Sequence, residues 1–427
     1  MKDRLYQVAV VGLMLTSMGV VMGLASPGLS DTDLGVVESQ VHMPVVIATL
    51  ILYAIVLSRL LTDPTKIVQC CLRMKMFLPI VLFSIVSAAW STDPVTTLRR
   101  SGFLLLTVLV GIILGTDFGV QQIGRLVAAA SVVHIVACGV LFVVARQFLY
   151  QPSDVTAMKG LTTHKNMFGF EMGLATIAFL LVPFARLAWL RWPLTIVAFA
   201  LLILSHSAGS LVATLCAIAL LPFLSVMQFP VVQRIPLLLF ALVAMIALGA
   251  LVFQNAALLP AVLSKDSTLT GRTELWALVL VAIGNHPWLG YGFDSFWQGL
   301  QGDSLTIIRG VGWLVPTAHN GYLDLLLGLG VVGAVLFLAP LVQMVVRALR
   351  YLAAEYSSAG YFPTAFIIFW LIYNLNESAL LARSGMPLLF LVALSASLGL
   401  ELAENSTAKI RTGEVPYVPA HQLHPTY

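Results

Sequence analysis

The stretch "PTAHNGYLDLLLGLGVVGAVLFLAPLVQMVV", residues 316–346, decides what kind of protein this sequence encodes. The run from Tyr322 to Val346 is almost wholly apolar and exceeds the roughly 20 residues that a helix needs to cross the hydrocarbon core of a bilayer. Three polar residues, His319, Asn320 and Asp324, lie at its start. A helix that only crosses the bilayer would not need them. We therefore expect a membrane-spanning helix with functional side chains at its mouth.

The composition of the whole chain repeats this apolar pattern. Hydrophobic residues make up 59% of the 427 residues and charged residues 10%, with a mean hydropathy of +0.96, whereas soluble domains carry roughly 25% charged residues. We predict an all-α polytopic membrane protein with about twelve transmembrane helices. The expected spans are Tyr6–Ala25, Met43–Leu61, Met76–Trp90, Ser101–Thr116, Leu126–Ala145, Met167–Phe184, Pro193–Leu204, Leu211–Met227, Ile235–Phe253, Tyr322–Val346, Phe362–Leu380 and Met386–Leu402.

The basic residues orient these spans. With the N-terminus in the cytoplasm, 14 of the 23 Lys and Arg residues fall on cytoplasmic connections, as the positive-inside rule requires. The first apolar stretch is longer than the core of a signal peptide, so we expect a retained helix, with cleavage after Ala25 as the alternative. We expect helices 1–9 in residues 1–253, an external catalytic loop in 254–319, helices 10–12 in 320–402 and a cytoplasmic tail in 403–427.

The other nine basic residues face outward in this arrangement, and several lie near the ends of spans. Snorkelling to the interface explains such positions one by one. Together they predict an outward-facing site for an anion. They are Arg99, Arg100, Arg146, Lys159, Lys165, Lys265, Arg272, Arg309 and Arg383.

The composition argues against several other classes of protein and site. The net charge of +4 and the pI near 8.9 come from scattered basic residues and not from a basic helix, so we expect no nucleic-acid partner. Cys70 and Cys71 are adjacent, and Cys138 and Cys216 lie within apolar runs, so the cysteines predict neither a disulfide framework nor a metal site.

The longest connection, residues 254–319, lies outside the cytoplasm and is much longer than the links of compact folds. Its segment "GRTELWALVLVAIGNHP" has apolar residues at helical spacing, which predicts an amphipathic helix that ends before Pro287. Arg272 and Glu274 lie on the first turn of that helix, where their side chains can face a cavity at the membrane surface.

The segment "WLGYGFDSFW" follows this helix, and Gly290 and Gly292 permit a tight turn there. The turn presents four aromatic side chains. They suit either an interfacial aromatic belt or a platform for sugar rings, and the sequence leaves both open. They are Tyr291, Phe293, Phe296 and Trp297.

Ionisable side chains within spans cost about 2.5–3.5 kcal/mol each to insert, so each needs a function or a partner. Glu171 lies early in the sixth span, Asp324 early in the tenth and Glu377 late in the eleventh, and all three fall toward the outer side. That is the side of the long connection. His134 lies inside the fifth span, where we expect a satisfied core histidine.

The mouth of the tenth helix suits an anionic ligand. Asn320 and Asp324 are four residues apart and so share one helix face, and a helix N-terminus attracts phosphate. A cap of the helix fully explains Asn320. For His319, a bond to the backbone is the alternative to a role in the site. Arg272, Lys165 and Arg309 on the same side of the membrane favour the role in the site.

Three strings in this region carry a resemblance to a known family. They are "GRTELW" at residues 271–276, "HPWLGYGFDSF" at 286–296 and "AHNGYLDLLLGLGVVG" at 318–333. In this order and spacing they resemble the O-antigen ligase and Wzy-type polysaccharide polymerase family of bacterial membrane enzymes. "THKNMFG" at 163–169 and "NLNESALL" at 374–381 are similar to its exopolysaccharide polymerase branch.

The resemblance implies an inverting glycosyl transfer at the bacterial inner membrane, without a metal, another cofactor or a nucleotide sugar. The implied donor is an oligosaccharide on undecaprenyl pyrophosphate and the acceptor is a growing polysaccharide, with a chain-length regulator and a flippase as expected partners. It also implies that Arg272 and His319 engage the pyrophosphate or assist the acceptor. Cations stabilise such a leaving group. A histidine suits either a general base or a phosphate ligand, and the sequence leaves both open.

These inferences give one candidate site. Its predicted catalytic residues are Arg272, His319 and Glu274. Its predicted substrate-binding residues are Lys165, Asn320, Asp324, Arg309, Arg99, Arg100, Glu377, Tyr291 and His206.

One departure from the family pattern bears on the choice of function. Ligases of the family carry a Ser-x-Ser-Arg-like turn after the seventh span, whereas this chain has "LSHSAGS" at residues 204–210, with His206 and no arginine. Lys165 would then supply the positive charge, which favours a polymerase. A ligase to lipid A core or to protein, and a transporter or flippase of a lipid-linked or anionic solute, remain the alternatives.

Overall fold

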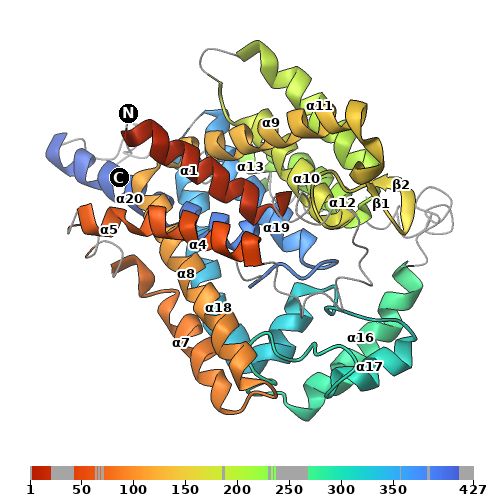
Figure 1. Cartoon of the computed structure of the whole chain (residues 1–427). Helices are drawn as coiled ribbons and strands as arrows, with labels where there is room; N and C mark the ends of the chain where they lie inside the picture. Colours follow the sequence, from red (N-terminus) through yellow and green to blue (C-terminus); the bar gives the residue numbers. More distant parts are fainter. Residues whose placement is uncertain are drawn as a thin grey trace.

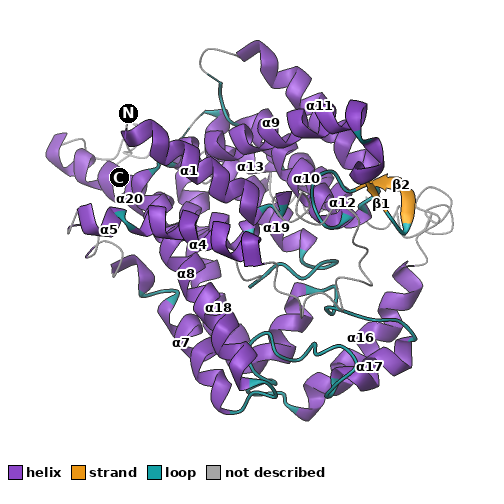
Figure 2. Cartoon of the chain, viewed as in Figure 1, coloured by secondary structure: helices purple, strands orange, loops and turns teal. Residues whose placement is uncertain are grey.

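The computed structural model shows an almost entirely helical protein (Figures 1 and 2). Within the described residues, one short hairpin of β1 (Tyr150–Gln151) and β2 (Asp154–Met158) is the only β-structure. The sequence did not predict this hairpin. The described residues are 2–20, 43–62, 65, 68, 72–184, 188–228, 232–233, 235–236, 268–355, 357–381 and 385–412.

The helices follow the apolar runs of the sequence. Most of the expected ninth span and the first part of the long connection, residues 237–267, lie outside the described residues, as does the alternative cleavage point after Ala25. The α-helices are α1 (Lys2–Ser17), α4 (Met43–Leu57), α5 (Arg59–Thr62), α7 (Leu78–Val86), α8 (Pro94–Asp117), α9 (Val120–Val144), α10 (Lys165–Leu181), α11 (Arg191–Leu204), α12 (Ala208–Ala219), α13 (Leu221–Leu224), α16 (Thr268–Asn285), α17 (Ser304–Val311), α18 (Gly321–Ala354), α19 (Phe362–Tyr373) and α20 (Met386–Thr412).

Several of these helices suit a lipid bilayer. Within the described ranges, four are long and apolar enough to cross a membrane, namely α8, α9, α18 and the Met386–Glu404 part of α20. Shorter apolar helices accompany them, including α4, α11 and α19. This set is consistent with a multi-pass membrane protein, as the composition predicted.

Small residues let α8 and α20 pack closely at the centre of the buried core. A Cβ at Gly111 would lie 2.8 Å from the Cβ of Val392, and one at Gly115 would collide with the carbonyl oxygen of Ala393. Glycine therefore permits a backbone approach that larger residues would block, as is common between membrane helices.

A buried ion pair joins α9 to α10. His134 Nδ1 lies 2.7 Å from Glu171 Oε2, and both side chains are almost fully buried. The backbone N–H of Leu161 donates to His134 Nε2 at 3.2 Å. The expectation of a satisfied core histidine is therefore confirmed, and Glu171, which the sequence placed with the outer acids, has its partner within this core.

The helix α18 is broken at Gly330, where the sequence predicted an uninterrupted span. Gly330 has φ 63° and ψ −165°, a conformation that is essentially restricted to glycine. Residues 287–292 fill the break. The N–H groups of Val331 and Val332 donate to the carbonyls of Pro287 and Trp288 at 2.9 and 3.1 Å.

The same loop also caps the first half of α18. Tyr291 N donates to Leu327 O at 2.8 Å, and Gly292 N donates to Gly328 O at 3.0 Å. Gly290 and Gly292 have φ angles of 66° and 100°, which confirms the tight turn predicted there. Four backbone hydrogen bonds thus replace those that the broken helix cannot make.

The helices α16 and α17 lie together at the lower right of Figure 1, with α10, α11 and α12 above them. The predicted helix is confirmed as α16, and Leu275 and Val279 of its predicted apolar face are buried in a second apolar cluster. Its opposite face is not polar as expected, since Leu280 and Val281 are exposed there. The short helix α17, which buries Ile307 and Ile308 in that cluster, was not predicted.

One correction concerns Glu377, which the sequence placed late in the eleventh span. The helix α19 ends at Tyr373, and Glu377 lies in the following turn. Asn374 explains this end, because its Oδ1 accepts the N–H of Ala379 at 2.8 Å and its carbonyl accepts the N–H of Gly321 at 2.9 Å. These bonds turn the chain toward the mouth of α18.

Candidate functional site

The Glu377 carboxylate is the meeting point of three side chains from distant segments. Arg272 Nη2 lies 3.1 Å from its Oε1 and His319 Nδ1 lies 3.5 Å from its Oε2. Asn166 Nδ2 donates to Oε1 at 2.5 Å. The three ionisable side chains are 15–18% exposed, so the cluster is sheltered but open to a ligand.

Arg272 reaches this cluster from the first turns of α16. Its Nη1 also lies 3.5 Å from Asn376 Oδ1, beside Glu377 in the chain. Trp276, one turn along α16, donates its indole N–H to the carbonyl of Ala318 at 2.9 Å. This bond ties the helix that carries Arg272 to the residue before His319.

His319 occupies a left-handed backbone conformation with φ 48°, which histidine tolerates better than most residues. Its N–H donates to Thr317 Oγ1 at 3.2 Å, and its ring lies 5.9 Å from that of Trp313. Asn320 then caps α18, since its Oδ1 accepts the N–H groups of Tyr322 and Leu323. The backbone therefore turns the imidazole out of the helix axis and toward Glu377.

The start of α10 supplies the third partner of Glu377. His164 is the N-cap, and its Nδ1 accepts the N–H of Asn166 at 3.1 Å. Tyr373 donates its hydroxyl to the carbonyl of Asn166 at 3.3 Å. Lys165 does not contact Glu377 in this way; its Nζ lies 3.5 Å from Asp154 Oδ2 on β2. The string "THKN" thus contributes Asn166 directly to the cluster.

The surroundings of Glu377 set its charge. Burial raises the pKa of this carboxyl, but its hydrogen bond and electrostatic interaction with His319 and the positive charge of Arg272 outweigh that effect, so the pKa lies below its ordinary value. The carboxylate is therefore ionised at neutral pH. It holds the guanidinium of Arg272 and the imidazole of His319 beside each other.

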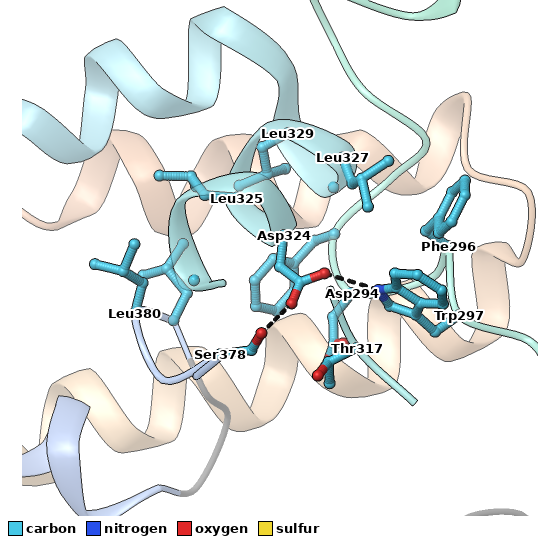
Figure 3. A pocket seen from close by; sticks show the side chains of 14 residues that line it. Asp294, Phe296, Trp297, Thr317, Asp324, Leu325, Leu327, Leu329, Ser378 and Leu380 are labelled. Atoms are coloured by element: carbon cyan, nitrogen blue, oxygen red, sulfur yellow. Dashed lines mark hydrogen bonds between the residues drawn. The ribbon is translucent and has the colours of Figure 1, made fainter. Parts of the chain in front are cut away.

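The carboxylate of Asp324 joins three segments at the mouth of α18 (Figure 3). It accepts hydrogen bonds from Trp297 Nε1 at 2.7 Å, from the N–H of Ala318 at 3.1 Å and from Ser378 Oγ. Trp297 lies in the loop after α16, Ala318 in the loop before α18 and Ser378 in the turn after α19. Asp324 thereby fixes how these segments sit relative to one another.

The other predicted site residues lie at several separate places. Arg100 is buried and pairs with Asp294 at 3.3 Å, and buried Tyr291 donates its hydroxyl to the carbonyl of Ala282 at 3.0 Å. His206 is exposed with φ 52°. Three further predicted residues are exposed, namely Arg99, Glu274 and Arg309. Lys265 and Arg383 lie outside the described residues.

A pocket of about 100 Å³ lies beside the cluster. Its walls come from residues 293–297, 317–329 and 378–381 (Figure 3). Thr317 and Ser378 belong to the loops that carry His319 and Glu377, so the pocket and the cluster share two walls. Within the described ranges, which include this cluster and pocket, no group of three or more His, Cys, Asp or Glu side chains could hold a metal ion.

Sequence reasoning missed Asn166 and Asn376. Both lie in strings that carried the resemblance, directly beside residues that were selected, and both are uncharged amides at the ends of apolar runs. A search for any polar residue at such ends would have found them. Their pairing with Glu377 and Arg272 spans more than 100 residues of sequence and needed the fold.

Comparison with known proteins agrees with the motifs. The sequence pattern of the O-antigen ligase family matches residues 193–338. The chain is 24% identical over 289 residues to the exopolysaccharide production protein ExoQ of Rhizobium meliloti (strain 1021), which covers 64% of this chain and 65% of that protein. It is 35% identical over 68 residues to an O-antigen ligase of Pseudomonas aeruginosa, covering 16% and 15%. The matches span less than two thirds of either relative. The resemblance to this family is confirmed.

Proposed function

Because residues 193–338 carry the pattern of the O-antigen ligase family, we propose that this protein is an inner-membrane glycosyltransferase that polymerises lipid-linked oligosaccharide repeat units. The donor is an oligosaccharide on undecaprenyl pyrophosphate, and the acceptor is a sugar hydroxyl of the growing polysaccharide. The observation that carries the proposal is the shared Glu377 carboxylate, which holds Arg272 and His319 together.

The proposed reaction is an inverting displacement. The acceptor hydroxyl oxygen attacks the anomeric carbon of the donor, and the bond between that carbon and the phosphate oxygen breaks. The electron pair leaves with undecaprenyl pyrophosphate, and the hydroxyl proton passes to His319. Since Nδ1 of His319 faces Glu377, its Nε2 is the nitrogen that takes the proton.

Arg272 has the complementary task. Negative charge builds up on the pyrophosphate as it leaves, and a guanidinium held in place for that charge lowers the barrier. Arginine stays charged and can donate two parallel hydrogen bonds to phosphate oxygens. The bonds to Glu377 and Asn376 hold this side chain in position before the substrate binds.

The topology follows the predicted orientation. We place both termini in the cytoplasm and residues 254–319 outside it. Arg59 and Asp117, which pair at 3.5 Å, then lie on the inner side. A flippase that delivers the donor and a chain-length regulator are the expected partners.

A polymerase is favoured over a ligase by the longer of the two similarities. The match to the exopolysaccharide production protein covers 64% of this chain, and the match to the O-antigen ligase covers 16%. The turn at residues 204–210 also lacks an arginine. A ligase to lipid A core or to protein would use the same cluster with another acceptor.

The first test removes the two proposed catalytic groups. We expect Arg272→Ala and His319→Ala each to abolish polymer while lipid-linked single repeat units accumulate and the protein stays at normal abundance. Arg350→Ala, an exposed arginine at the far end of α18, is the matched control and should leave polymer unchanged. Normal polymer in both site variants would reject the proposal.

A transporter of lipid-linked solutes is the second candidate, and the break in α18 favours it, because transporters place substrates at broken helices. In this protein, however, residues 287–292 fill the break with backbone hydrogen bonds. Purified protein in vesicles separates the two functions. Movement of the lipid-linked oligosaccharide without any new glycosidic bond would support the transporter.

A further inference from the structure

The pocket beside the cluster differs from it in charge. None of the 14 residues that line the pocket is basic, and its two ionisable residues are Asp294 and Asp324. Arg272 and His319 belong to the cluster and are not among these 14 residues. Arg100 pairs with Asp294 from outside the lining. The lining therefore offers a diphosphate no basic side chain, whereas the cluster offers Arg272.

The lining chemistry suits a neutral ring that carries hydroxyl groups. Phe293 and Phe296 are buried behind the lining, whereas Trp297 is half-buried. The C–H face of a sugar can pack on the ring of Trp297. Asp294 is about one third exposed, at 34%, and its carboxylate, which pairs with Arg100 through Oδ1, can also accept a hydrogen bond from a sugar hydroxyl. Thr317 Oγ1 already accepts the N–H of His319 and can donate its own proton to a ligand.

The position of the pocket fits the second substrate of the proposed reaction. Thr317 lies two residues before His319, and Ser378 lies directly after Glu377. A sugar in the pocket would therefore lie against the loop that carries His319 and the turn that carries Glu377, while the diphosphate of the donor binds Arg272. The basic side chain in the cluster and the lack of one in the pocket lining would keep the two substrates in their own places.

We propose that this pocket, walled by Asp294, Phe296, Trp297, Thr317 and Leu381, binds the terminal sugar of the acceptor. The inference rests on the proposed glycosyltransferase and adds to it a separate acceptor subsite. Asp324 has a structural task in this subsite, because its oxygens accept hydrogen bonds from Trp297, Ala318 and Ser378.

The test fills the pocket without touching the cluster. Leu381→Trp places a large side chain at a partly exposed wall position. Leu375→Trp, an exposed leucine of the same turn that does not line the pocket, is the matched control. The full-length protein is assayed in vesicles with a lipid-linked repeat unit as donor and a lipid-free repeat-unit oligosaccharide as acceptor.

We expect Leu381→Trp to raise the KM for the oligosaccharide at least tenfold, with the donor KM within twofold of the wild-type value, and Leu375→Trp to change neither. A raised donor KM with an unchanged acceptor KM would overturn the inference and assign the pocket to the lipid carrier. Unchanged values for both substrates would also overturn it.

A second variant and a reference reaction keep these outcomes distinct. Thr317→Val removes one hydroxyl at nearly constant volume, together with the hydrogen bond that this hydroxyl accepts from the N–H of His319. It should raise the acceptor KM and lower kcat, with the donor KM unchanged, even if Leu381→Trp fails to fold. If the wild-type protein itself forms no glycosidic bond in these vesicles, the proposed function fails. If the wild-type protein reacts and neither variant changes the acceptor KM, only the acceptor subsite fails.

Discussion

The Glu377 carboxylate is shared by side chains from α10, α16 and the loop before α18. Its negative charge offsets the positive charge of Arg272 and orients the ring of His319. A single acid thus links the group proposed to bind phosphate with the group proposed to take the proton. Replacing Glu377 with glutamine removes the charge of this side chain and keeps its shape.

Glu377→Gln tests the charge. The amide keeps the size of the side chain but cannot balance Arg272, and we expect kcat/KM to fall about 100-fold or more. The folded-state pKa of Glu377 lies below its ordinary value. The ionised carboxylate therefore adds to the free energy of unfolding at pH values above its unfolded pKa of about 4.3, and this contribution is lost as the pH falls through the folded pKa.

Melting temperatures across a pH series measure this contribution. We expect wild type to melt above Glu377→Gln at neutral pH, with the difference shrinking as the pH falls below about 4.3. A difference that grows on acidification would contradict the assigned direction of the pKa shift.

Asn166 and Lys165 are neighbours with different contacts, so their variants discriminate between two hypotheses. Asn166→Ala removes the 2.5 Å bond to Glu377, and we expect kcat to fall about tenfold through loss of a hydrogen bond to a charged group. Lys165→Ala removes a contact with Asp154 and should change kcat less than threefold. A larger loss in Lys165→Ala would restore lysine as the source of positive charge that the sequence predicted.

Among the helices, α18 shows how a local break positions a site. The first half of this helix ends where residues 287–292 insert, and this half carries Asp324 and the cap Asn320. The loop thereby fixes the mouth of the helix independently of the long second half. The conformation of Gly330 makes the arrangement possible.

Gly330→Ala should disrupt that arrangement. Its φ of 63° with ψ −165° strains any other residue by about 1–3 kcal/mol, and a Cβ there would collide with the carbonyl group of Trp288. We expect lower thermal stability and weaker activity. Gly102→Ala on α8 is the control, because its Cβ meets open space and alanine should stabilise that helix by roughly 0.5–1 kcal/mol. Equal stability of the two variants would argue against a strained break.

For the whole molecule, the prediction to test is the orientation in the membrane, with residues 254–319 outside the cytoplasm. Gln301 lies before α17 and Gln122 lies in the first turn of α9, and both are exposed. In a background without the native cysteines, we expect a membrane-impermeant maleimide to label Gln301→Cys in intact cells and Gln122→Cys only after permeabilisation. The reverse pattern would put the cluster on the cytoplasmic side and rule out the proposed topology.

The sequence predicted the helical class and the parts that depend on local pattern. The apolar spacing around Leu275 predicted α16, and the position of Asn320 predicted a helix cap. The break at Gly330 was missed, because an apolar run carries no sign of a loop inserted from elsewhere. The bond from Asn166 to Glu377 joins residues 211 apart in the chain and depends on tertiary packing.

The loop that fills the break in α18 also constrains how this protein can vary in length. Its four backbone hydrogen bonds match donors and acceptors one to one between residues 287–292 and 327–332. Adding or deleting one residue in 287–292 would shift every pair. The exposed turn at residues 299–303, with Gly299 and Gly302 at positive φ, carries no such register. Insertions, natural or engineered, are therefore expected at that turn and excluded from the loop that precedes it.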